Sequence, residues 1–329
     1  MKNRIALIVL FTFSVTLVLG QQKELGIVKL RGTKLTYPLV NKWIFEFNKE
    51  YPNIKVLIAP AAPADSIDFS IASYALSASD LEGNREAVVV SRYVQLPVAN
   101  SKRPDLAQLQ ATGFTEKSLS DLFFTENTPN FLASSQTQTP IALYVRDRPV
   151  CAVKAFATHY GNDPKELKGT GIKGDDQDLA AAVRNDVNGL CFNNLGFIYD
   201  VKTRKITEGL AVIPLDLNEN GKIDKDEKIY GTLDNVVDFI EKTHHPKFVN
   251  ERVNFIFKKT STNTSAGVFL NWVLTKGQKF HHELGFLTLD DQLLVEQRVI
   301  AATTFKTSSS SCEGADELMK KRKSKQVNN

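Results

Sequence analysis

Residues 26–58, GIVKLRGTKLTYPLVNKWIFEFNKEYPNIKVLI, decide the fold class of this chain. Residues 26–31 are predicted to form a strand, and the apolar side chains between residues 39 and 50 recur at the spacing of an amphipathic helix. Pro38 suits the first turn of that helix because its missing N–H group would have no intrahelical partner there. Residues 54–58 form a second predicted strand. Since a strand–helix–strand crossover is almost always right-handed, we expect these two strands to lie parallel in one sheet.

The rest of the chain continues this alternation. Strands are predicted at residues 66–73, 88–90, 93–98, 141–146, 193–199, 209–214 and 253–257, and helices at residues 114–123, 153–160, 179–183, 233–241, 267–274 and 278–284. Thr115 is the expected N-cap of the first of these helices, with Ser118 at the capping-box position. The pattern predicts an α/β fold with mixed sheets, and a mature chain of about 300 residues usually divides into two lobes.

The first twenty residues predict export. Lys2 and Arg4 precede an apolar run over residues 5–19, which is followed by Gly20. This order is typical of a secretory signal peptide cleaved near Gly20, and the run is shorter than the ~20 residues that span a bilayer. An uncleaved membrane anchor is the alternative. The mature protein is therefore expected to be periplasmic or secreted.

The charge distribution argues against nucleic acid as a partner. The formal net charge is +4, of which the predicted signal peptide carries +2 and residues 308–329 carry +2, so the body of the chain is near neutral. Binding to a phosphate backbone needs clustered Lys and Arg on the folded body. Residues 306–329 are predicted to form a disordered basic tail.

Residues 216–227, DLNENGKIDKDE, match the twelve-position calcium loop. Oxygen-bearing side chains occupy positions one, three, five and nine, glycine occupies position six, and a glutamate occupies position twelve. No helical pattern flanks the loop, so we expect a structural Ca²⁺ site rather than a sensor. A solvated acidic Asn-Gly turn is the alternative. The predicted ligands are Asp216, Asn218, Asn220, Lys222 through its carbonyl, Asp224 and Glu227.

The three cysteines allow at most one internal disulfide. Cys151 and Cys191 both lie in the body of the chain, whereas Cys312 lies in the predicted tail. In an oxidising compartment Cys151 and Cys191 form the candidate pair, and buried free thiols are the alternative.

The sequence predicts no enzymatic activity. It contains no Gly-x-Ser-x-Gly, no His-Glu-x-x-His and no phosphate loop ending in Gly-Lys-Ser/Thr. Cys151 with a distant histidine suggests a thiol nucleophile, but nothing in the sequence fixes their geometry.

Several segments resemble the phosphate-binding proteins of bacterial ABC transporters. They are residues 32–39 with Lys42-Trp43, DFSIASYAL at residues 68–76, LYVRDRPVCAVKAF at residues 143–156, residues 169–175, and FLNWVLTKGQKFHHELGFLTL at residues 269–289. The calcium-loop segment resembles a subgroup of the same family. The resemblance covers roughly residues 26–290.

This resemblance implies a type II periplasmic solute-binding protein fold, with two α/β lobes joined by two crossing strands. Lobe one would be residues 26–96 plus 252–305, and lobe two residues 97–251, with crossings near residues 96–98 and 252–257. It further implies a monomer that captures phosphate or a similar tetrahedral oxyanion and delivers it to a membrane ABC permease.

The resemblance also implies a binding site. Two helix starts, at residues 33–38 and after Arg146, would present free backbone N–H groups to the anion. Arg146 matches the family's ligand arginine, and Asp68 matches a carboxylate that accepts the ligand's proton and so favours hydrogen phosphate over sulfate. The expected ligand-binding residues are Thr33, Lys34, Thr36, Asp68, Ser70, Arg146 and Ala152.

The sequence departs from the family where two hydroxyl donors are expected. The family places Ser-Gly-Thr four residues after the arginine, whereas this chain has Val150, Cys151 and Ala152. Losing two hydrogen bonds to a charged ligand costs on the order of 1.5–3 kcal/mol each. A second hypothesis follows: a calcium-stabilised extracytoplasmic module that kept the fold, lost tight anion binding and has no transport role.

Overall fold

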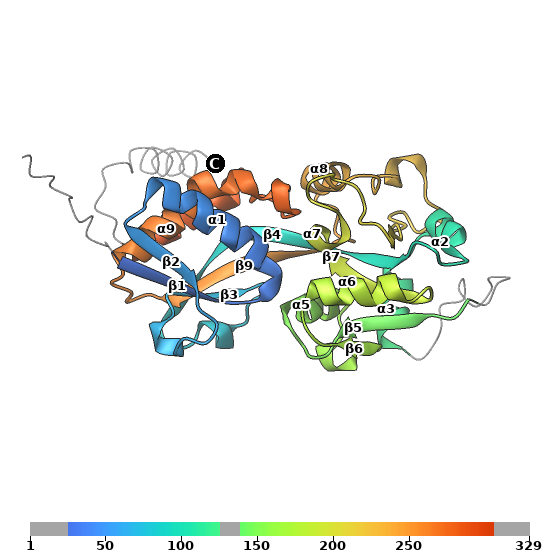
Figure 1. The fold of residues 1–329 in the computed structure, drawn as a ribbon, viewed down its shortest axis with the longest axis horizontal. Helices are drawn as coiled ribbons and strands as arrows, with labels where there is room; N and C mark the ends of the chain where they lie inside the picture. The colour runs from blue at the N-terminus through green and yellow to red at the C-terminus, as the bar shows by residue number, and fades with distance from the viewer. Residues whose placement is uncertain (1–25, 126–138, 306–329) are drawn as a thin grey trace, which may run out of the picture.

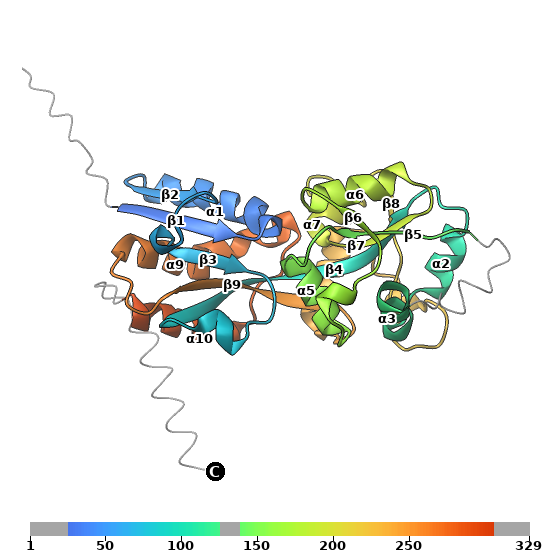
Figure 2. The same ribbon diagram turned by 90° about the horizontal axis from the view of Figure 1, so that it is seen from below.

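The computed structural model describes residues 26–125 and 139–305, which form a mixed α/β fold (Figures 1 and 2). The predicted signal peptide, the basic tail and Cys312 lie outside the described residues. The strands are β1 (Gly26–Gly32), β2 (Ile54–Ile58), β3 (Phe69–Ala72), β4 (Arg85–Asn100), β5 (Ala142–Arg146), β6 (Thr170–Ile172), β7 (Gly189–Asn194), β8 (Leu210–Val212) and β9 (Val249–Lys258). The α-helices are α1 (Tyr37–Glu50), α2 (Leu106–Thr112), α3 (Glu116–Phe124), α5 (Cys151–His159), α6 (Asp176–Asn185), α7 (Leu195–Ile198), α8 (Leu233–Thr243), α9 (Thr264–Thr275) and α10 (Asp291–Thr304).

Nine strands form one connected sheet in the order β2-β1-β3-β9-β4-β7-β5-β6, with β8 paired to β4. The predicted parallel pairing of β1 with β2 is confirmed, and β3 and β5 also join the sheet through parallel ladders. The β4 ladders to β9, β7 and β8 are antiparallel. The molecule is elongated, with β1, β2, α1 and α9 in one half and β5, β6, α3 and α6 in the other (Figure 1).

β4 runs through both halves and exchanges partners on the way. Residues 85–95 pair with β9, and residues 95–99 pair with β7. The exchange occurs at Gln95, which lies opposite both Val249 and Asn194. The two halves are thus joined through β4, and β9 runs beside β4 between them, with one register shift in the ladder between Val89 and Ser91 (Figure 2).

The core of the first half packs α1 and α9 against β1, β3 and β9. Trp43 is fully buried, and its Nε1 donates to the Gly277 carbonyl at 2.9 Å, which satisfies the one polar atom of the side chain. Its ring meets Phe255 edge-on, with the centroids 6.0 Å apart. Two residues of α5, Ala152 and Ala155, also belong to this core, so α5 reaches across from the second half.

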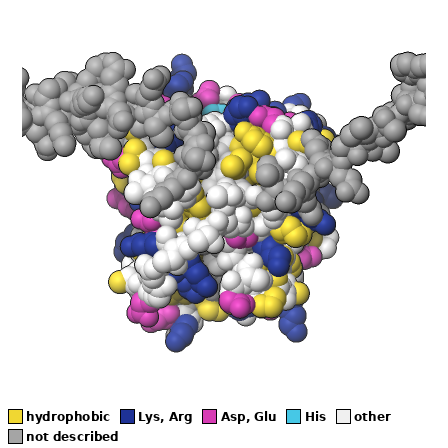
Figure 3. Space-filling view, turned by 90° about the vertical axis from the view of Figure 1, so that its left-hand side faces the viewer, with side chains coloured by type: hydrophobic (Ala, Val, Ile, Leu, Met, Phe, Trp, Pro, Cys, Tyr) yellow, Lys and Arg dark blue, Asp and Glu magenta, His cyan; other side chains and the backbone are white. Residues whose placement is uncertain are grey.

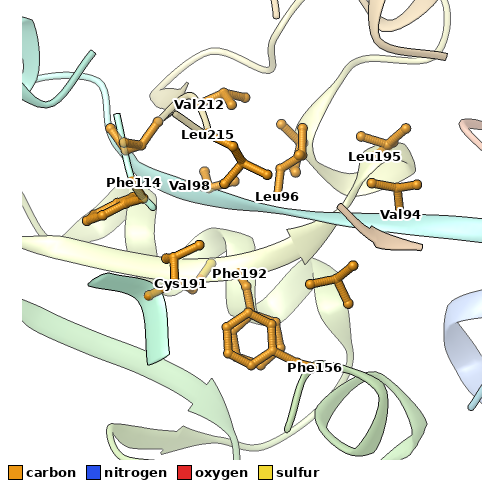
Figure 4. Packing of buried hydrophobic residues seen from close by; sticks show 14 of the residues in the cluster. Val94, Leu96, Val98, Phe114, Phe156, Cys191, Phe192, Leu195, Val212 and Leu215 are labelled. Carbon is orange, nitrogen blue, oxygen red and sulfur yellow. The ribbon is translucent and has the colours of Figure 1, made fainter. Parts of the chain in front are cut away.

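The core of the second half is built around β4 and β7 (Figure 4). Phe156 from α5 stacks on Phe192 from β7 with ring centroids 3.7 Å apart. Cys191, the neighbour of Phe192, is fully buried in this core as a free thiol. Cys151 is also free, at the start of α5. The predicted Cys151–Cys191 disulfide is therefore wrong: both described cysteines are free thiols, and of the two Cys191 is buried and Cys151 half-buried.

Several element predictions are corrected by packing between distant segments. The strand expected at residues 193–199 is the end of β7 followed by α7, where Gly196 lies so close to residue 284 that an added Cβ would fall 2.6 Å from the Leu284 carbonyl oxygen. The strands expected at residues 88–90 and 93–98 are one strand, β4. Residues 278–284 form short 3₁₀ turns, and helix α10 was not predicted. The capping box of Thr115 and Ser118 at the start of α3 is confirmed.

No helix in the described residues is long and apolar enough to cross a membrane. At the end of the molecule that carries β1 and β2, cationic and acidic side chains are interspersed (Figure 3). This face does not offer the single-sign patch that a polyanion would need.

A buried ion pair holds the outer end of β4. Arg103 Nε lies 2.6 Å from Asp105 Oδ1, and the two side chains are 0% and 3% exposed. The same guanidinium donates from Nη1 to the Asn188 carbonyl at 2.7 Å, which fastens the loop before β7.

We expect Asp105→Ala to lower the free energy of unfolding by roughly 3–5 kcal/mol, because it leaves the Arg103 charge buried without its partner. Asp121→Ala is the matched control, since Asp121 pairs with the exposed Lys117 and its loss should cost no more than ~1 kcal/mol. Urea denaturation measures both, and equal losses would contradict the role given to the buried pair.

Candidate functional site

A cavity of about 620 Å³ lies between the two halves of the molecule. The first half lines it with residues of the β1–α1 turn, β3 and the segment after β3, and the second half with the β5–α5 segment and the start of α6. The polar and charged lining residues are Thr33, Lys34, Ser70, Tyr74, Ser79, Asp80, Arg85, Arg146, Arg148, Cys151, Lys154, Asp175 and Asp176.

The β1–α1 turn brings backbone close to the cavity. Gly32 lies against β3 so tightly that an added Cβ would fall 2.2 Å from the Ile71 carbonyl oxygen. Three sequence-predicted residues, Thr33, Lys34 and Ser70, line the cavity on this side. Thr36 does not line it: the side chain is 1% exposed and its hydroxyl donates to the Thr33 carbonyl at 2.9 Å, so it stabilises the turn instead.

Arg146, the last residue of β5, lines the cavity from the opposite half. The residue is only 7% exposed. Its Nη2 donates to the Gly174 carbonyl, whereas Nε and Nη1 have no hydrogen-bond partner among the described residues. A buried guanidinium with open donors is costly unless an acceptor completes it. The fork of this side chain matches the spacing of two oxygens on an oxyanion.

Helix α5 starts at the cavity beside Arg146. Its N-cap, Val150, supplies no side-chain hydrogen bond, so the first N–H groups of the helix keep their donor capacity for another acceptor. Gln95 Nε2 donates to the Ala152 carbonyl at 3.0 Å and ties this first turn to the β4 crossing. Ala152 and Cys151 both line the cavity.

Asp68, expected to accept the ligand's proton, does not line the cavity. Its Oδ2 accepts from the Lys29 backbone N–H at 2.8 Å, and its Oδ1 accepts from Asn263 Nδ2 at 2.8 Å. Asn263 is the N-cap of α9. Asp68 therefore fastens β1 to the start of α9, and the prediction that it contacts the ligand is corrected on this ground.

Other carboxylates face the cavity instead. Asp80 accepts from the Tyr74 hydroxyl at 2.7 Å and from the Ser77 N–H at 2.8 Å; burial works against ionisation, but these hydrogen bonds outweigh it and lower the pKa of Asp80. Asp176, the first residue of α6, is 7% exposed. Burial raises the pKa of Asp176 to about 6, and the positive charge of Arg146 opposes part of that rise.

One contact crosses the cavity. Lys154 Nζ, on α5, lies 4.5 Å from the centroid of the Tyr74 ring, on the segment after β3. Such a cation–π contact contributes roughly 0.5–2 kcal/mol. The two halves thus touch through side chains that line the cavity.

Asp176, Tyr74 and Lys154 line the cavity but were not predicted to do so from the sequence. Tyr74 and Lys154 lie inside the segments quoted for the resemblance, but no spacing rule separates them from neighbours that point into the core. Asp176 had one usable signal, since it follows Gly174-Asp175 at a helix start, where loops of α/β proteins place functional groups.

The calcium-loop segment is a compact turn held by its own hydrogen bonds. Asp216 and Glu227 are 1% and 3% exposed. Asp216 accepts from the Gly221 N–H at 2.8 Å, and Glu227 accepts from the N–H groups of Leu217 at 2.7 Å and Asp224 at 2.8 Å. Gly221 has φ +82°, as the sharp turn requires.

The side chains of the other predicted ligands of this loop interact with the carboxylate of Asp224. Lys222, Asn220 and Asn218 donate to its carboxylate and lower its pKa to about 2. Counting His, Cys, Asp and Glu alone, the described residues contain no group of three or more placed to hold a metal ion. Calcium binding therefore stays a prediction.

No family model matches this chain, and no curated protein matches its sequence. Solved structures share its fold. A proposed phosphate ABC transporter substrate-binding protein from Clostridium perfringens, with bound phosphate, is 14% identical with a TM-score of 0.61, over 80% of this chain and 100% of that one. An ABC-type phosphate transport receptor from Vibrio cholerae is 13% identical with a TM-score of 0.57, over 80% and 100% of the two chains. A possible phosphate binding protein from Planctomyces limnophilus is 14% identical with a TM-score of 0.54, over 85% and 98%.

At this level of identity the likeness concerns the fold, and it confirms the predicted periplasmic binding protein fold class. The chain accordingly has the mixed α/β architecture of substrate-binding proteins, with its cavity between the two halves.

Asp176 gives the fold a measurable pH dependence. Its pKa is about 6 in the folded protein against an ordinary value of 3.8, so between these pH values the folded chain holds a proton that the unfolded chain has released. Stability therefore falls as pH rises through this window. Relative to Asp176→Asn, the wild type should lose on the order of 1–3 kcal/mol between about pH 4 and pH 7, measured by urea unfolding of both proteins without ligand. A pH-independent difference would contradict this assignment.

Proposed function

We propose that this chain is an exported binding protein that captures a small tetrahedral oxyanion of the phosphate class in the cavity and delivers it to a membrane ABC permease. One observation carries the proposal: Arg146 is 7% exposed, lines the cavity, and leaves two guanidinium nitrogens without a hydrogen-bond partner in the described part of the chain. The fold shared with phosphate-binding proteins supports the same class of ligand. The signal-like first twenty residues support export.

Each part of the cavity would contribute a defined interaction. Arg146 would donate to anion oxygens from its unpartnered Nε or Nη1, together with the second N–H of Nη2, a planar fork that lysine does not reproduce. The hydroxyls of Thr33 and Ser70 would donate from the opposite half, and the start of α5 would add backbone N–H groups and a partial positive charge. Hydrogen bonds to a charged ligand contribute roughly 1.5–3 kcal/mol each.

The cavity lies between the two halves, so a ligand in it would contact both of them. The β1–α1 turn and the β5–α5 segment belong to different halves that meet through β4 and β9. An anion held by both segments would hold the halves together. Domain closure around the ligand is a common consequence of this arrangement.

A second candidate function is a binding module without a transport role. It is favoured by Val150, Cys151 and Ala152, which replace side-chain hydroxyl donors at the start of α5, and by the engagement of Asp68 away from the cavity. In that case the cavity would not hold an oxyanion tightly. The two candidates differ in one measurable property, the stabilisation of the folded chain by oxyanions.

We expect millimolar phosphate or a phosphonate to raise the melting temperature of the mature protein. A ligand at 100 times its Kd stabilises by about 2.7 kcal/mol. Arg146→Gln should abolish this shift, because it removes the guanidinium fork and its charge and leaves a shorter, neutral side chain. Arg184→Gln, which removes an exposed arginine outside the cavity, should keep the shift in full.

The same titration with sulfate and molybdate tests selectivity among tetrahedral anions. If none of these oxyanions shifts the melting temperature of the wild type, the transport proposal fails and the second candidate stands. If Arg146→Gln and Arg184→Gln respond alike, the anion binds somewhere other than this cavity.

We further propose that residues 216–227 bind a structural Ca²⁺ ion, with Asp216, Asn218, Asn220, Lys222, Asp224 and Glu227 as its ligands. The donor set supports this proposal, since it offers the hard oxygens that Ca²⁺ prefers. Asp216 and Glu227 are nearly fully buried and accept from backbone N–H groups rather than from Lys or Arg among the described residues. A bound divalent cation would supply the positive charge that these carboxylates lack.

Chelation should lower the melting temperature if calcium occupies this loop, and added Ca²⁺ should restore it. Glu227→Gln should reproduce the effect of chelation and no longer respond to Ca²⁺. Asp226→Asn removes one exposed negative charge at the neighbouring position, outside the proposed ligand set, and should behave as the wild type. If neither chelator nor Ca²⁺ changes the melting temperature, the loop is a hydrogen-bonded turn that does not bind calcium.

A further inference from the structure

The cavity is larger than a bare tetrahedral oxyanion requires. Its volume of about 620 Å³ corresponds to roughly twenty waters at ~30 Å³ each, whereas a phosphate ion has five non-hydrogen atoms. The halves already touch across it, through Lys154 and Tyr74 and through Ala152 packed in the first core. The space beside Arg146 is therefore a partly open cleft with room for a ligand that carries a substituent.

The cavity also carries charges of both signs. Arg146 and Asp176 are each 7% exposed and interact electrostatically. Yet among the described residues the one hydrogen bond of the guanidinium goes to the Gly174 carbonyl and not to this carboxylate. Arg146 and Asp176 thus line the same cavity without forming a direct ion pair.

The other acids of the cavity already have partners. Asp80 accepts from Tyr74 and from Ser77, and Asp175 accepts from the Gln177 N–H at 3.0 Å as the N-cap of α6. Asp176 accepts from its own backbone N–H, and its carboxylate accepts no hydrogen bond from another described residue, so it is the acid of the cavity most available to a ligand. A dianion bound at Arg146 would be repelled by an ionised Asp176, unless the ligand brings a positive charge to that carboxylate.

We propose that the ligand is a tetrahedral phosphorus oxyanion with a short alkylammonium group, whose oxyanion binds Arg146 and whose ammonium group binds Asp176. This inference rests on the proposed function and narrows its substrate class to amino-substituted phosphonates or phosphate monoesters. The zwitterion offsets both buried charges in one ligand. Inorganic phosphate would offset only the cation.

Four probes test the inference on the wild-type mature protein by calorimetric titration: 2-aminoethylphosphonate, ethylphosphonate, O-phosphoethanolamine and inorganic phosphate. We expect the two amines to bind at least tenfold more tightly than ethylphosphonate, which has the same head group and lacks the ammonium. The relative affinity of the two amines distinguishes a phosphonate from a phosphate monoester as the better fit.

Two variants assign the effect to Asp176. Asp176→Asn should bind ethylphosphonate and 2-aminoethylphosphonate with affinities within about threefold of each other, because the acceptor for the ammonium loses its charge. Asp238→Asn removes an exposed carboxylate on α8, outside the cavity, and should keep the wild-type preference. The circular dichroism spectrum of each variant verifies that it is folded.

The outcomes separate this inference from the function on which it rests. Ethylphosphonate or inorganic phosphate binding as tightly as the amines, in the wild type, would overturn the inference and leave oxyanion capture intact. An unchanged amine preference in folded Asp176→Asn would also overturn it. No binding of any of the four probes would instead remove the proposed function itself.

Discussion

The antiparallel pairing of β4 with β9 is the constraint on which the rest of this structure depends. The ladder joins residues 85–95 to residues 249–258, and beyond Gln95 the same strand pairs with β7. Two hydrophobic cores therefore grow on one sheet, instead of on two separate domains joined by a flexible linker. The β1–α1 turn and the start of α5 line one cavity, and the two halves that carry them are joined through this shared ladder.

Burial of charge gives that cavity its chemistry. Desolvation disfavours an ionised group. The structure nevertheless buries both the guanidinium of Arg146 and the carboxylate of Asp176 at the cavity. Elsewhere in the molecule, other groups of the chain compensate a desolvated charge. Arg103 forms an ion pair with Asp105 at 2.6 Å, and Asp68 accepts two hydrogen bonds. Arg146 forms no such ion pair among the described residues, and its Nε and Nη1 have no hydrogen-bond partner there.

Asp68 and Asp176 show that a family resemblance does not by itself place a carboxylate in the binding site of a divergent chain. The local sequence around Asp68 made it the expected acceptor for the ligand, whereas packing assigns it to the junction between β1 and α9. Asp176 was not predicted as a site residue from the sequence, but the start of α6 brings it to the same cavity as Arg146. An aspartate can accept hydrogen bonds from backbone N–H groups as well as from a ligand, so residue type and spacing do not separate the two roles.

The sequence by itself determined the α/β class, the parallel β1–β2 pair and the capping box of α3, because hydrophobic periodicity, crossover handedness and side-chain capping act over a few neighbouring residues. The resemblance to phosphate-binding proteins also pointed to Thr33, Lys34, Ser70, Arg146 and Ala152, all of which line the cavity. Only the tertiary structure decided that Thr36 and Asp68 stabilise the fold, that Cys191 is a free thiol inside a core, that residues 195–198 leave the strand, and that Asp176 joins Arg146. Each of these outcomes depends on which atoms a distant segment brings within hydrogen-bonding or packing distance, and no local pattern carries that information.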